Sequence, residues 1–313
     1  MNRLLSYILS ARGLVALAII LVSCFVVTKF AVHHGGGDFE FAQLYVHLVP
    51  AALVGSDGTP LLELSIPGFA VFDTNETLEG TQIPLFNLQI FQIASVLLVI
   101  WCFMGVPRYL RTGKGDPISK MLAGFAMWIR DEIVYPEMGK ERGRKFLPYF
   151  LCIFFFILFM NLMGLVPNSV TPTASIFVTA GLALTTLIAM LVCGMAAQGP
   201  VAFWKNLVPH VPLALWPLMF LVELIGLLVK PFALMIRLFA NMTGGHMVVL
   251  SFMGLIFFMA DKWGAAGGYG ASFLGVGFAV FIMIIEAFVA MLQAFIFTQL
   301  SVMFISASVH PEH

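Results

Sequence analysis

Charged side chains are scarce in this sequence. Its 313 residues include 16 lysines and arginines and 16 aspartates and glutamates, so charged residues are only 10% of the chain and the formal net charge is zero. A soluble domain carries about 25% charged residues. The chain has too little polar material to cover a soluble fold, so we expect an all-α integral membrane protein. The absence of a basic excess argues against nucleic acid as a partner.

Other features that the sequence lacks exclude further classes. The four cysteines all lie inside apolar runs, which favours free thiols in the membrane over a disulfide scaffold. No G-x-x-x-x-G-K-[ST] motif is present, so nucleotide chemistry within this chain is not expected. Only His246 lies deep in an apolar segment, which argues against a bis-histidine haem. We therefore expect no cofactor and no resident metal.

The few charges are unevenly placed along the chain. The segment 108–145 holds nine of the 16 basic side chains, whereas 30–107 holds seven acids and no lysine or arginine. Short basic loops stay on the cytoplasmic side of a membrane. We expect 108–145 to be cytoplasmic and the acidic segment 33–86 to be extracytoplasmic, with a small hairpin within 56–84.

Windows of roughly 20 apolar residues predict about five to six membrane helices. Residues 1–32 read equally well as a cleaved signal peptide or as a signal-anchor helix, and the membrane domain proper is 87–313. With the first segment retained, six crossings place the C-terminus in the cytoplasm. The predicted spans are 13–32, 87–106, 147–167, 173–197, 213–260 and 271–307. Apolar residues at helical spacing within 118–134 predict an amphipathic helix on the inner membrane surface.

The last two predicted spans are too long to cross a bilayer upright. A straight helix over 213–260 would be roughly 70 Å long, against a hydrocarbon core of about 30 Å. We expect both helices to be strongly tilted, with kinks at Pro217 and Pro231. The Gly-rich segment 261–270 is predicted to be a loop that joins them into an antiparallel hairpin.

Ionisable side chains inside these two helices are the main functional signal, because a charge in the membrane costs several kcal/mol. Opposite residues of an antiparallel hairpin have a constant sum of residue numbers. Arg237 and Gln293 add to 530, and His246 and Glu286 add to 532, so one hairpin places both pairs level. Glu223 lies fourteen residues before Arg237 on the first helix.

The Arg237–Gln293 pair and the His246–Glu286 pair suit different chemistry. A histidine beside a carboxylate can pass protons near neutral pH, whereas arginine stays protonated and can only attract an anion or block a leak. These residues therefore predict an ion path. The alternative is that the polar side chains only hold the helices together by hydrogen bonds.

Several motifs in this part of the chain resemble subunit a of F-type ATP synthases, the membrane stator of a rotary proton motor. The segment 230–246, Lys-Pro-Phe-Ala-Leu-Met-Ile-Arg-Leu-Phe-Ala-Asn-Met-Thr-Gly-Gly-His, resembles that family's essential-arginine segment. Leu292-Gln-Ala-Phe-Ile-Phe297 resembles its last-helix motif. The segments 161–167 and 172–179 resemble its two middle-helix motifs, while residues 1–86 carry no recognised motif of the family and their role stays open.

The resemblance implies a role for each residue. Arg237 would face the carboxylates of a ring of c subunits, and His246 and Glu286 would line an outer half-channel with Asn241 and Gln293 nearby. Glu223 would lie towards the inner side. Some bacterial members carry the acid and the histidine in the opposite order, so the pair is exchanged here but retained.

The resemblance also implies a cellular location and a set of partner subunits. The chain would be a non-catalytic, multi-pass subunit in the plasma (inner) membrane of a bacterium, with the lipid bilayer around it. Its partners would be the c-subunit ring, the b-subunit peripheral stalk and the remaining ATP synthase subunits, which would catalyse ATP formation. The alternatives are a sodium-translocating version of the same subunit or a secondary transporter, although no internal repeat supports the latter.

Overall fold

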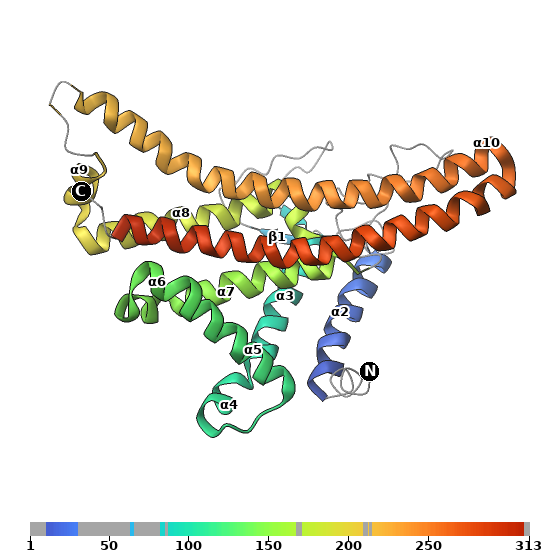
Figure 1. Ribbon diagram of the computed structural model, residues 1–313, viewed down its shortest axis with the longest axis horizontal. Coiled ribbons are helices and arrows are strands. Elements are labelled where there is room, and N and C mark those ends of the chain that lie inside the picture. The colour runs from blue at the N-terminus through green and yellow to red at the C-terminus, as the bar shows by residue number, and fades with distance from the viewer. Residues whose placement is uncertain are drawn as a thin grey trace.

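The computed structural model describes residues 11–30, 63–65, 82–84, 87–166, 171–208, 212 and 215–309. This part of the chain is almost entirely helical, which confirms the predicted all-α membrane fold (Figure 1). The helices are α2 (Ala11–Phe30), α3 (Asn87–Phe103), α4 (Val106–Thr112), α5 (Pro117–Trp128), α6 (Tyr135–Met138), α7 (Lys140–Gly164), α8 (Ile176–Gln198), α9 (Pro200–Asn206) and α10 (Trp216–Val309). A π-helical segment, Ile129–Val134, joins α5 to α6, and a 3-10 turn, Pro172–Ala174, precedes α8.

Two short strands are the other regular elements described. β1 (Glu63–Ser65) pairs antiparallel with β2 (Gln82–Pro84), with Leu64 opposite Ile83. This pairing confirms the small hairpin expected within 56–84. The rest of the acidic segment 33–86 lies outside the described residues.

Four described helical segments are long and apolar enough to cross a membrane, and the last of them, α10, is a hairpin with two arms. With α2 as a further apolar helix of 20 residues, the fold has the five to six membrane helices expected. α2 packs against α3 through an apolar cluster that includes Ile19, Phe91 and Leu98. Whether residues 1–32 are cleaved stays a prediction.

The predicted Gly-rich loop at 261–270 is wrong. Both arms of α10 stay helical up to a single reversal at Gly264, whose φ of 67° lies in the left-handed region. A side chain there would be strained, so glycine suits the turn. Just beyond it, a Cβ on Gly268 would lie 2.8 Å from the Cβ of Ala260, so the missing side chain lets the arms touch.

The prolines act differently from the prediction. Pro217 lies in the first turn of α10, where its missing N–H costs nothing, so it makes no kink. Pro231 lies inside the first arm without a break in the helical backbone. Each arm still exceeds twice the hydrocarbon thickness at about 1.5 Å per residue, so neither can stand upright in a bilayer.

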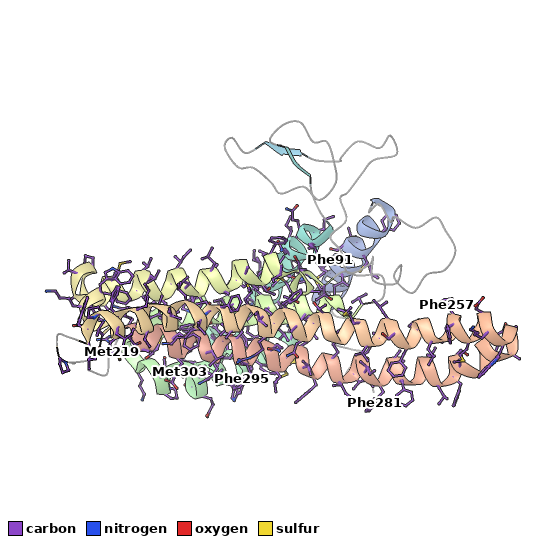
Figure 2. The ribbon with its side chains drawn as sticks, turned by 90° about the horizontal axis from the view of Figure 1, so that it is seen from above. Phe91, Met219, Phe257, Phe281, Phe295 and Met303 are labelled. Atoms are coloured by element: carbon purple, nitrogen blue, oxygen red, sulfur yellow. The ribbon has the colours of Figure 1, made fainter. Side chains whose placement is uncertain are left out.

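The protein core lies where α10 packs on α7 and α8. Its fully buried side chains include Phe150, Phe154 and Ile157 of α7, together with Leu238 and Ile305 from the two arms of α10. Large apolar side chains also cover the outside of α10 (Figure 2), as expected for helices whose solvent is lipid. The closed end of the hairpin extends past the other described helices in both views, with Phe257 near it (Figures 1 and 2).

The amphipathic segment predicted at 118–134 forms α5 and the π-helical segment. Its apolar stripe does not face lipid alone, because Leu122, Ile129 and Ile133 are buried in the protein core. The opposite side is exposed and polar. There Arg130 donates two hydrogen bonds to Asp131, which lower the pKa of that carboxyl. Its location at the inner membrane surface stays a prediction.

Candidate functional site

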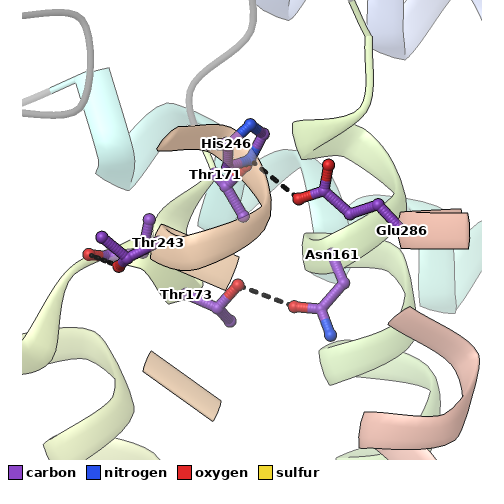
Figure 3. Close-up of polar contacts among 7 residues, drawn as sticks. Asn161, Thr171, Thr173, Thr243, His246 and Glu286 are labelled. Carbon is purple, nitrogen blue, oxygen red and sulfur yellow. Dashed lines mark hydrogen bonds and ion pairs between the residues drawn. The ribbon is translucent and has the colours of Figure 1, made fainter. Parts of the chain in front are cut away.

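The α10 hairpin brings together the two pairs that the residue-number sum predicts. At one level the Gln293 side-chain amide donates to the backbone carbonyl of Arg237 over 3.5 Å. At the other, the His246 Nε2 lies 3.8 Å from the Glu286 Oε1 (Figure 3). The two levels are nine residues apart on the first arm, or about 13 Å along the helix axis.

Arg237 points away from the protein core. The neighbouring Leu234, Leu238 and Met242 are buried, whereas Arg237 and Asn241, one turn apart, are exposed. In the part of the chain that the structure describes, Arg237 makes no ion pair. An arginine on a lipid-facing helix is costly unless a partner neutralises it, so its exposed guanidinium calls for an anion from beyond the described residues.

Glu223 does not join either pair. It is half-buried and lies fourteen residues before Arg237 on the same arm, or about 21 Å away along the axis. Lys230, between them, places its amine 5.7 Å from the ring centroid of Phe304 on the other arm. This arm therefore carries Glu223, Lys230 and Arg237 at separate levels.

Glu286 is the most deeply buried carboxyl among the described residues, with 5% of the residue exposed. Its Oε1 has no hydrogen-bond partner within the described part of the chain. A Cβ on Gly245 would lie 2.6 Å from that oxygen, so the carboxyl packs directly on the backbone of the first arm. A buried, under-satisfied carboxyl next to an imidazole is suited to taking up and releasing a proton.

Polar side chains from other elements converge on the same place. The Thr171 hydroxyl contacts the Nε2 of His246, and the Thr243 hydroxyl donates to the backbone carbonyl of Ala174 over 3.4 Å. The Thr173 hydroxyl donates to Asn161 Oδ1 over 2.7 Å (Figure 3). α7, the turn before α8 and the first arm of α10 are thus tied together beside the His–Glu pair.

Thr171 was missed as a site residue from the sequence, and Asn161, Thr173 and Thr243 entered only as parts of motifs. A weak signal was available for one of them. Asn161 stands inside the apolar run of α7 and is fully buried, so it needs partners; besides Thr173, its side-chain amide donates to Ala290 over 3.5 Å. The threonines carry no such signal, since a lone threonine is common in membrane helices.

No group of three or more His, Cys, Asp and Glu side chains near enough to hold a metal occurs among the described residues. The fold and the site therefore define a multi-pass α-helical membrane protein with ionisable side chains placed along a long membrane hairpin.

Comparisons with known proteins agree with this class. The family described as ATP synthase A chain matches residues 89–306. ATP synthase subunit a of Myxococcus xanthus is 41% identical over 216 residues, which cover 69% of this chain and 68% of that one. A subunit a from Anaeromyxobacter sp. is 38% identical over 72% of this chain and 54% of its own length. ATP synthase subunit a 2 of Prosthecochloris aestuarii is 34% identical over 99% of this chain and 93% of its own.

The chain belongs to the ATP synthase A chain family. The members of this family are non-catalytic subunits of the membrane sector, so the resemblance read from the segment 230–246 is confirmed.

Proposed function

We propose that this chain moves protons across a bacterial plasma membrane as the stator subunit of an ATP synthase, and that the flow drives rotation of a c-subunit ring. Membership of the family places the chain in that complex and in ion transport. The observation that carries the finer proposal is Arg237, which is exposed on the outer face of α10 and unpaired among the described residues, about 13 Å from the buried His246–Glu286 pair.

Each residue then has a physical task. A carboxylate of a c subunit that arrives beside Arg237 supplies the missing anion, and the positive charge favours its deprotonated form. His246 and Glu286 pass protons between the outer solution and the ring, with Asn241 and Gln293 next to that route. Glu223 lies towards the inner half-channel. Because arginine keeps its proton, it separates the two half-channels.

The same proposal assigns neighbouring subunits and a membrane orientation to this chain. The c-ring faces the exposed side of α10, and the b-subunit stalk and the remaining subunits hold this chain still against the catalytic head. The basic segment 108–145 and the C-terminus are cytoplasmic, and 33–86 is extracytoplasmic.

Cysteine crosslinking tests the contact with the ring. The four native cysteines are first replaced by serine, and a cysteine is then introduced in place of Ala233, which is exposed one turn from Arg237. The matched control is Leu238→Cys on the same helix, 1% exposed. Ala233→Cys should form a disulfide with a cysteine placed near the carboxylate of the c subunit, and Leu238→Cys should not. Equal yields, or none from Ala233→Cys in assembled complexes, would refute a stator–rotor contact at this face.

Sodium is the alternative ion. A His–Glu pair relays protons by bonding changes that a sodium ion cannot use, so protons are favoured. In membrane vesicles that contain the whole complex, ATP addition should quench a pH-sensitive dye without added sodium, and a protonophore should reverse the signal. Sodium uptake that persists with the protonophore present would instead identify a sodium motor.

A further inference from the structure

The Thr171 hydroxyl and the Glu286 carboxyl both lie beside the same ring nitrogen of His246. Its hydroxyl contacts the Nε2 of His246, and the same nitrogen lies 3.8 Å from the Glu286 Oε1 (Figure 3). One ring nitrogen therefore faces two oxygens, one from the turn before α8 and one from the second arm of α10. Thr171 is only 3% exposed, so water does not compete freely for its hydroxyl.

The backbone around Thr171 holds that hydroxyl in place. The carbonyl of Thr171 accepts a hydrogen bond from the Ala174 N–H, and the Ala174 carbonyl accepts one from Thr243 on α10. On the other side, a Cβ on Gly164 would lie 1.8 Å from the Thr171 Oγ1, so glycine at the end of α7 leaves the space that the hydroxyl occupies. The position of Thr171 is thus set by α7 and α10 together.

A hydroxyl can serve both protonation states of the histidine. It donates to Nε2 when that nitrogen is unprotonated, and it accepts from the Nε2–H when the ring is charged. An ionised carboxylate can only accept, so Glu286 alone would hold the ring in one state and release it in the other. A partner that can either donate or accept a hydrogen bond therefore keeps the imidazole in one orientation throughout a cycle of proton transfer.

We propose that Thr171 is a positioning residue of the outer proton path, whose hydroxyl holds the Nε2 of His246 towards Glu286 whether the ring is neutral or protonated. This inference rests on the proposed function, because it presumes that His246 carries protons.

The test is a matched pair of substitutions in the whole complex. Thr171→Val keeps the shape and removes the hydroxyl, whereas Thr171→Ser keeps the hydroxyl. ATP-driven dye quenching in vesicles, divided by the amount of assembled complex, should fall about fivefold to tenfold in Thr171→Val, the size expected for one hydrogen bond. Thr171→Ser should restore most of the rate. A normal rate in Thr171→Val, or equal losses in both variants, would overturn the proposal.

A second pair covers the case in which Thr171→Val does not assemble. Gly164→Ala leaves the hydroxyl in the chain but displaces it from His246, whereas a Cβ on Gly181 of α8 meets no atom within 4 Å. Gly164→Ala should slow pumping and Gly181→Ala should not. Wild-type pumping by Gly164→Ala would overturn the proposal.

His246→Ala, measured in the same vesicles, distinguishes a failure of the proposed role of Thr171 from a failure of the proposed role of His246. If it pumps normally, His246 is outside the path and the role of Thr171 fails with it, whereas proton transport by this chain stands. If it is impaired while Thr171→Val is normal, only the role of Thr171 is refuted.

Discussion

Replacing Arg237 by alanine is expected to abolish proton-driven ATP synthesis while the complex still assembles. The side chain is exposed and unpaired within the described residues, so its removal leaves no buried partner unsatisfied and opens no cavity in the core. What is lost is the fixed charge that favours the deprotonated ring carboxylate. An interaction of several kcal/mol at membrane depth corresponds to a loss of about a hundredfold or more.

The measurement is ATP synthesis by inverted vesicles energised through respiration, with assembly checked by co-purification of the c subunit. Lys230→Ala is the matched control, because it removes another exposed cation from the same arm, seven residues away, whose amine lies over Phe304. It should keep most of the activity. Substantial synthesis by Arg237→Ala would remove the central residue from the proposed mechanism.

The pairing of Arg237 with Gln293 and of His246 with Glu286 was predictable from residue numbers alone. An antiparallel hairpin of two regular helices has a single free parameter, the position of its reversal, and the polar residues constrained that position to 265 or 266. The reversal lies at Gly264. The two positions differ by one or two residues, and the pairs stay level along the arms because both helices keep the same rise per residue.

The extent of the turn was not predictable by the same means. In a soluble protein a run as rich in glycine as 261–270 favours a loop. In the structure the helical backbone hydrogen bonds continue through Gly267 and Gly268, and only Gly264 departs from helical geometry. Glycine content alone therefore did not show where the helix ends, because glycine is permissive in a helix as well as in a loop.

Thr171 could not be found from the sequence for a different reason. Its contact with His246 depends on how the end of α7 and the turn before α8 pack on α10, and this is a tertiary arrangement that no periodicity encodes. The same holds for α5, since its spacing showed which face is apolar but not that Ile129 and Ile133 meet the protein core.

The second large effect is expected at His246 and Glu286, where each single loss should be severe and their exchange should be tolerated. A positioned acid or base contributes roughly a hundredfold to ten-thousandfold to a proton transfer. His246→Ala and Glu286→Gln should each reduce ATP-driven pumping by about a hundredfold on that basis. The double variant His246→Glu/Glu286→His keeps both groups in the same space with their positions reversed.

The exchange should recover a large part of the pumping rate. A proton relay needs one imidazole and one carboxyl in contact, and it does not matter which of the two helix arms carries which group. Pumping is measured by dye quenching per assembled complex, with His246→Glu alone as the control that has two acids and no imidazole. If the double variant is no better than that control, the pair does not act as an interchangeable relay. Its order along the path would then be fixed by contacts specific to each position, including the one between Thr171 and His246.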